Sequence, residues 1–179
     1  AFDLGYIEID TTEELLAKVI NIIKKLSKWN GHLYNWYNIK TLEPLNPKFV
    51  STVDSGNFIG YLYIVKRFFE ENFKENILMI NEIDSLIKNT DFSKLYSENT
   101  RLLSIGFLVD ENKLIDSYYD FLASEARLAS LVAIAKKDIP EKHWNNLSRT
   151  LTTLDNYKGL ISWSGTAFEY LMPNINVKR

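Results

Sequence analysis

The chain has 179 residues, with 21 Lys and Arg against 23 Asp and Glu, so its formal net charge is -2 at pH 7. This length supports one domain with a real hydrophobic core, which excludes a miniprotein or a disordered tail. The lack of Cys excludes disulfides, thiolate nucleophiles and Cys-built metal sites. The near-neutral charge disfavours nucleic acid, and the apolar runs are shorter than the ~18 residues of a membrane span. We expect a soluble segment with no nucleic-acid partner and no membrane insertion of its own.

The N-terminal half of the sequence predicts three helices, with one long loop between the first and the second. Apolar residues recur at helical spacing from Thr11 to about Lys28. From Trp29 to Gly56 the periodicity stops, and long loops of this kind in compact domains are often functional. Helical spacing returns from Asn57 to about Asn72 and from Ile77 to about Asn89. We expect these two segments to form an antiparallel helical pair.

The C-terminal half predicts shorter elements. A β-leaning apolar string at 101–110 followed by a turn favours a small hairpin. The pattern from Tyr118 to about Lys136 predicts the most apolar helix, whose Ala residues at three- and four-residue steps allow close packing. After Pro140 comes a short segment around Trp144.

The last segment is expected to be extended over 159–165 and helical from Thr166 to Leu171, where Pro173 ends the helix. The predicted fold is therefore mainly α. Paired antiparallel helices and short extended or hairpin segments would form a single domain over residues 1–179.

Three carboxylates are candidates for chemistry. Glu125 lies in a segment with few other charges, where it either forms a structural ion pair or lines a cavity that tunes its pKa. Asp54 precedes a helix beside hydroxyl residues, so Asp54 or Ser55 is either an N-cap or part of a polar-ligand site. Glu169, between two aromatic residues, is either a solvated helix residue or part of the same kind of site.

Aromatic residues make up 13% of the chain, and several lie near loop-to-helix junctions. Tyr and Trp rings serve in cores and as sugar-stacking surfaces alike. The two His residues, His32 and His143, lack the spacing of a helical metal motif. The residues alone are consistent with carbohydrate chemistry, and they leave a purely structural helical domain open.

Six strings carry a resemblance to a known family: GHLYNWY at 31–37, TLEPL at 41–45, FVSTVDSGN at 49–57, SIGF at 104–107, SYYDFLASEARLAS at 117–130 and ISWSGTAFEYLMP at 161–173. In this order they resemble the glucoamylase-like central domain of cyclic β-1,2-glucan synthases, which are large multidomain membrane proteins of bacteria. The resemblance implies an (α/α) toroid of paired helices that acts on β-1,2-glucan. In the family this domain transglycosylates or cyclises the glucan, and related domains are β-glucan hydrolases.

The resemblance also implies roles for residues of this chain. Glu125 would be a catalytic carboxylate, acting as nucleophile if the mechanism retains configuration, and Asp54 would be a second catalytic residue. The predicted substrate-binding residues are Trp36, Tyr37, Asn57, Tyr118, Tyr119, Asp120, Arg127, Trp163 and Glu169. The resemblance implies no cofactor and no metal.

The family continues past the motif that ends at Pro173 with further helices and a second acidic motif, which this sequence lacks. The chain therefore resembles the N-terminal half of a glucoamylase-like barrel, and the fragment alone would be inactive if its second carboxylate lies in the other half. Its expected partners are β-glucan, the remaining half of the toroid and other domains of the parent. The alternative is a non-catalytic glucan-binding or scaffolding module. The resemblance implies a bacterial parent at the inner membrane, with this domain in the cytoplasm.

Overall fold

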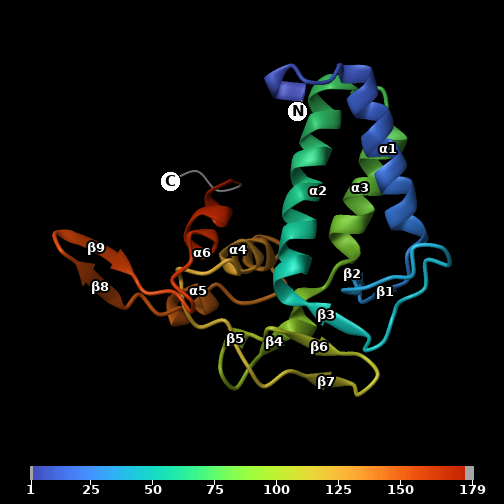
Figure 1. Cartoon of the computed structure of the whole chain (residues 1–179). Helices are drawn as coiled ribbons and strands as arrows, with labels where there is room; N and C mark the ends of the chain where they lie inside the picture. Colours follow the sequence, from blue (N-terminus) through green and yellow to red (C-terminus); the bar gives the residue numbers. More distant parts are fainter. Residues whose placement is uncertain (1, 176–179) are drawn as a thin grey trace.

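The computed structural model describes residues 2–175 (Figure 1). The helices are η1 (Phe2–Leu4), α1 (Ile9–Lys25), α2 (Thr52–Asn72), α3 (Ile77–Asn89), η2 (Phe92–Leu95), α4 (Arg127–Ala135), α5 (Lys142–Asn146), α6 (Ala167–Leu171) and η3 (Met172–Ile175). The strands are β1 (Lys28–Trp29), β2 (His32–Leu33), β3 (Phe49–Ser51), β4 (Tyr96–Ser97), β5 (Leu102–Leu103), β6 (Gly106–Leu108), β7 (Lys113–Leu114), β8 (Leu151–Leu154) and β9 (Tyr157–Leu160). The mainly α fold with short extended segments is confirmed.

The helices α1, α2 and α3 stand side by side at one end of the chain (Figure 1). The helix predicted from Thr11 is α1, and the antiparallel pair is α2 and α3, joined by a short turn. The side chain of Asn76 caps α3 by accepting a hydrogen bond from the Met79 N–H at 3.3 Å. Ile59, Phe69 and Ile83 lie in the core between these helices.

The start of α2 differs from the prediction. The helix begins at Thr52 because the Ser51 hydroxyl accepts a hydrogen bond from the Asp54 N–H at 3.2 Å. Ser51 is therefore the N-cap, and the N-cap role predicted for Asp54 or Ser55 is wrong. Strand β3 runs directly into the helix, and the Thr52 hydroxyl donates to the Ser104 carbonyl at 2.6 Å. This places Asp54 in the first helical turn.

The predicted helix from Tyr118 to Lys136 is also shorter in the structure, because α4 begins at Arg127. The preceding segment is instead held by distant backbone partners: the Tyr119 N–H donates to the Leu103 carbonyl, and the Leu122 N–H donates to the Ser148 carbonyl, both at 3.0 Å. Those bonds are incompatible with an α-helix over the same residues. Glu125 consequently lies in an irregular turn just ahead of α4.

Helices α2 and α4 pack unusually closely. A side-chain carbon placed at Gly56 would lie 2.4 Å from both Cα and Cβ of Ala129. One turn later, a carbon at Gly60 would lie 2.9 Å from Leu128 Cδ2. The small residues predicted to permit close packing thus do so at Ala129, and this contact fixes the first turn of α2 relative to the segment that carries Glu125.

The strands form small antiparallel sheets. The hairpin predicted near 101–110 is confirmed as β6 and β7, which extend a three-stranded sheet in the order β3, β6, β7. A separate hairpin, β8 and β9, projects away from the helices (Figure 1). The extended segment predicted over 159–165 therefore reaches only Leu160, and a tight turn follows it before α6.

Candidate functional site

Glu125 is a half-buried carboxyl group that no hydrogen bond or ion pair within residues 2–175 engages. The structural ion pair considered from the sequence is therefore absent from this part of the chain. Burial raises the pKa of Glu125, and the negative charges of Glu169 and Asp54 raise it further. A carboxyl group in such surroundings holds its proton to higher pH than an exposed one.

Tyr119 belongs to the same electrostatic environment. Burial raises the pKa of its hydroxyl to about 12, and the charges of Glu125 and Asp54 act in the same direction. Segments distant in sequence therefore meet here: the first turn of α2 brings Asp54, and the turn before α4 brings Tyr119 and Glu125. We call Asp54, Tyr119, Asp120, Glu125, Trp163 and Glu169 the candidate site.

Trp163 joins this group through two contacts. Its indole N–H donates a hydrogen bond to Asp120 Oδ1 at 2.9 Å. Its ring lies 6.2 Å from that of Tyr119, at an interplanar angle of 46°. The side chain is nevertheless 52% exposed. An exposed ring with a fixed orientation is a suitable surface for stacking a planar or cyclic ligand.

Glu169 is buried, with an exposure of 8%, so it is not the solvated helix residue considered from the sequence. Burial by itself would raise its pKa, but hydrogen bonds from Ser164, Ser162 and Thr166 outweigh that effect and lower the pKa to about 2. Thr166 and Glu169 also form a capping box at the start of α6. Glu169 is therefore an anion near neutral pH, and its pKa is shifted in the opposite direction from that of Glu125.

Asp54 lies at the edge of a small cavity of about 260 Å³ and is exposed. The cavity is also lined by Leu33, Tyr34, Asn35, Ser55 and Phe58. Within the described residues, the Oδ1 atoms of Asn35 and Asn57 are buried and have no hydrogen-bond partner. The unpaired amide oxygen of Asn35, in the same cavity lining as Asp54, is a spare hydrogen-bond acceptor for a hydroxyl-rich ligand.

The remaining predicted site residues are less closely connected to the candidate site. The Tyr37 hydroxyl is already used, because it accepts from the Tyr34 N–H at 2.9 Å and donates to the Ser27 carbonyl at 2.7 Å. Trp36 is 48% exposed on the same loop. Arg127 donates to Asn174 Oδ1 at 3.0 Å. No hydrogen bond or ring contact that the structure describes between residues 2 and 175 joins Trp36 or Tyr118 to the carboxylates of the candidate site.

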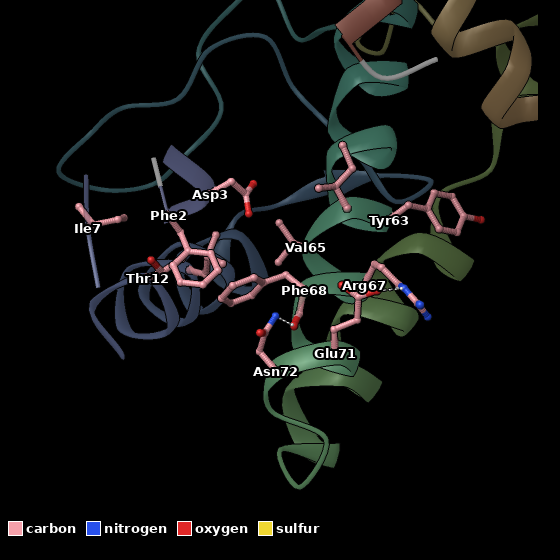
Figure 2. A pocket seen from close by; sticks show the side chains of 12 residues that line it. Phe2, Asp3, Ile7, Thr12, Tyr63, Val65, Arg67, Phe68, Glu71 and Asn72 are labelled. Atoms are coloured by element: carbon pink, nitrogen blue, oxygen red, sulfur yellow. Dashed lines mark hydrogen bonds and ion pairs between the residues drawn. The ribbon is translucent and has the colours of Figure 1, made fainter. Parts of the chain in front are cut away.

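A larger cavity of about 700 Å³ lies elsewhere, between the N-terminal segment, α1 and α2 (Figure 2). Figure 2 shows Phe2, Val65 and Phe68 in its mainly apolar lining, with Arg67 and Glu71 at the side. None of the 12 residues that line it is a predicted site residue. Size alone therefore does not identify the candidate site.

Asn35, Ser162 and Ser164 were not among the site residues predicted from the sequence. The T-x-x-E pattern of Thr166 and Glu169 is a sequence signal for a capped helix start, and it could have indicated that Glu169 bonds its own loop. Among the described residues, no group of three or more His, Asp or Glu is arranged to hold a metal ion. No helix in the same part of the chain is long and apolar enough to span a membrane.

A carboxyl group with a raised pKa near other carboxylates is an arrangement found in glycoside-processing sites, and the exposed Trp163 ring beside it suits a sugar ligand. Comparison with known proteins supports this class. The chain is 26% identical to the cyclic β-(1,2)-glucan synthase NdvB of Rhizobium meliloti (strain 1021), a match that covers 97% of this chain. The match extends over 298 positions, more than the chain contains, so the relative has insertions within it.

A glucoamylase candidate from Bacteroides fragilis NCTC 9343 shares the fold, with a TM-score of 0.72 and 14% identity over 93% of this chain. No family model matches. The chain spans 10% of the length of NdvB and 43% of the Bacteroides fragilis protein. The resemblance to cyclic β-1,2-glucan synthases and to glucoamylase-like proteins is thus confirmed.

Proposed function

We propose that the chain is part of a carbohydrate-active domain that processes β-1,2-glucan by transglycosylation, cyclisation or hydrolysis. The observation that carries this proposal is the state of Glu125: a carboxyl group without a hydrogen bond in the described structure, whose pKa is raised by burial and by neighbouring charges. Such a group is suited to donating a proton to the oxygen of a glycosidic bond. The similarity to a glucan synthase supports the substrate class.

In this proposal Glu125 acts as a general acid and base. A nucleophilic carboxylate must be ionised before it attacks, and a raised pKa opposes that state. The sequence resemblance implied a nucleophile, and the electrostatics of the turn before α4 favour the proton-donor role instead. Glu169 is unsuited to proton donation, because hydrogen bonds keep its pKa at about 2.

Glycoside chemistry generally needs a second carboxyl group, about 5 Å from the first in retaining enzymes and about 6.5–9.5 Å away in inverting ones. Asp54 is the candidate in this chain, since it is exposed and its charge acts on Glu125. The alternative is a carboxylate from further helices of the same domain. Because the chain spans 43% of the Bacteroides fragilis protein, we propose that it forms the N-terminal half of an (α/α) toroid in a bacterial membrane-associated parent.

The Glu125→Gln variant tests the proposed function. It keeps the shape of the side chain and removes the proton that the acid would donate. In the complete parent domain we expect turnover of β-1,2-glucan to fall at least a hundredfold while glucan affinity is retained. The surface variant Glu14→Gln, on α1 and away from the candidate site, is the matched control. Unchanged turnover in Glu125→Gln would refute the assignment.

A glucan-binding or scaffolding module without turnover is the second candidate function. The exposed ring of Trp163 favours it, because a stacking surface serves binding without any chemistry. Calorimetric titration of the 179-residue chain with β-1,2-glucan, with laminarin as a control polymer, measures the binding that both functions need. A parent domain that binds β-1,2-glucan but turns over none of it would favour the module.

A further inference from the structure

We propose that Glu169 is a positioning residue, which fixes the loop of residues 162–166 so that Trp163 is held as a glucan-stacking surface beside Tyr119. This inference rests on the proposed function and deepens it. The sequence resemblance placed Glu169 among the substrate-binding residues. The geometry instead assigns it an indirect role, in which it acts on the ligand through Trp163.

The hydrogen bonds of Glu169 all come from one short loop. Its Oε2 atom accepts from the Ser162 hydroxyl at 2.9 Å, from the Ser164 hydroxyl at 2.6 Å and from the Ser164 N–H at 3.0 Å. The Thr166 N–H also donates to the same oxygen, at 3.3 Å. Ser162 and Ser164 flank Trp163 in sequence, so both neighbours of the tryptophan are tied to one buried carboxylate.

The loop has a second internal constraint. The Gly165 N–H donates to the Ser162 hydroxyl at 2.9 Å. Gly165 has a φ of 69°, in the left-handed region that favours glycine. The turn therefore closes around the carboxylate of Glu169, and a different backbone path would leave that buried charge without its donors.

The ring of Trp163 is fixed at its other end. Its indole N–H is held by Asp120 in the segment before α4, while the residues on either side of it, Ser162 and Ser164, are bonded to Glu169 in α6. An indole anchored at both ends and still half exposed loses little freedom when a ligand stacks on it, which favours affinity. Because the carboxylate oxygens of Glu169 are occupied and the residue is buried, a sugar hydroxyl has little access to them.

The negative charge of Glu169 has a second effect on the candidate site. It raises the pKa of Glu125, after the larger effect of burial. A neutral residue at 169 should therefore lower the pKa of Glu125 as well as loosening the tryptophan. A residue that served only to stabilise the fold would alter neither the alkaline limb of the pH–activity profile, which the general acid Glu125 sets, nor the orientation of one particular ring.

The test is a double-mutant cycle on the 179-residue chain with Glu169→Gln, Trp163→Ala and the combined variant, and with Glu14→Gln as control. Affinity for β-1,2-glucan is measured by calorimetry, and folding by circular dichroism. We expect Glu169→Gln to weaken binding about tenfold in the presence of Trp163 and to have no further effect in its absence. Equal losses in both backgrounds would mean direct contact with glucan and would overturn the positioning role.

A second readout does not depend on glucan. The four Trp side chains give separate indole N–H resonances by NMR, and loss of one signal in Trp163→Ala identifies that residue. We expect Glu169→Gln to shift and broaden this resonance, because the loop no longer holds the ring against Asp120. An unchanged resonance would overturn the inference.

Two outcomes separate this inference from the proposed function. If the wild-type chain and the parent domain bind no β-1,2-glucan, the proposed function fails, while the resonance still decides whether Glu169 positions Trp163. If Glu169→Gln does not fold, Ser164→Ala removes the 2.6 Å hydrogen bond and leaves the charge in place. A shifted Trp163 resonance in that variant supports the inference, and an unshifted one refutes it.

Discussion

The contact between α2 and α4 offers a graded test of the packing argument, because three glycines differ in the space around them. A methyl group at Gly56 would lie 2.4 Å from the Cα of Ala129, a backbone atom that cannot rotate away. Carbon atoms in contact normally lie about 3.5–4.0 Å apart. The Gly56→Ala variant must therefore move the two helices apart by about 1 Å.

The magnitude follows from two opposing effects. Alanine in a helix is favoured over glycine by about 1 kcal/mol. Overpacking a tight core contact costs about 1–3 kcal/mol and sometimes more, and a gap approaching 1 Å weakens the remaining contacts by about a quarter to a half. Because buried Leu128 and Val132 also lie on α4, we expect a net loss of about 2 kcal/mol. For a domain of this size that corresponds to a fall in Tm of about 4–8 °C.

The assay compares Gly56→Ala, Gly60→Ala and Gly159→Ala by thermal and urea unfolding. At Gly60 the nearest atom is Leu128 Cδ2, at 2.9 Å, on a side chain that can rotate, so the change should be within about 1 kcal/mol of wild type. At Gly159 nothing lies within 4 Å, and the change should be within about 0.5 kcal/mol. If Gly56→Ala is as stable as Gly159→Ala, the close approach of the two helices is refuted.

Three further predictions concern titration and charge. Burial lowers the pKa of His143 in the folded chain. As the pH falls, the unfolded chain therefore takes up this proton first, at about pH 6.5. The free energy of unfolding should be greatest above that pH and should decrease as the pH falls below it. Urea unfolding at pH 7.5 and 5.0 checks this, and equal stability at both would contradict it. Because the pKa of Tyr119 is raised to about 12, the tyrosinate absorbance that Tyr119→Phe removes should emerge only near pH 12, and Glu125→Gln should move it lower. Asp84 accepts a hydrogen bond from Lys66 at 2.6 Å, so Asp84→Asn should cost about 1 kcal/mol, and the loss should shrink in 1 M NaCl.

Local patterns predicted the long helices well. The apolar spacing within α1 and α3 depends only on one helix face meeting the core, and that period can be read from the sequence. The start of α2 was missed by five positions, because Ser51 caps the helix and strand β3 leads straight into it. A hydroxyl followed three residues later by a carboxylate was available in the sequence as a signal of this boundary.

The error at Tyr118 has a different origin. The segment before α4 has a helical pattern of apolar residues, but its backbone bonds to Leu103 and Ser148, which are distant in sequence. No local property of the segment shows those partners. The environment of Glu169 is similar in kind: its burial depends on how the loop from Ser162 folds around it. For the segment from Tyr118 and for Glu169 alike, the sequence motif indicated the region of the candidate site. The backbone path of the segment and the role of Glu169 depend on tertiary contacts.

The projecting hairpin of β8 and β9 has a practical consequence for labelling. Tyr157 is 80% exposed, and within residues 2–175 the two strands pair only with each other. Asp155, at the tip, has a φ of 51° in a turn open to solvent. Surface turns of this kind tolerate insertions and chemical modification. A fluorophore attached through an engineered thiol at Asp155 would be the single reactive position in a chain without natural cysteine. The fluorophore would lie outside the candidate site, so it would report on ligand binding without adding bulk to that site.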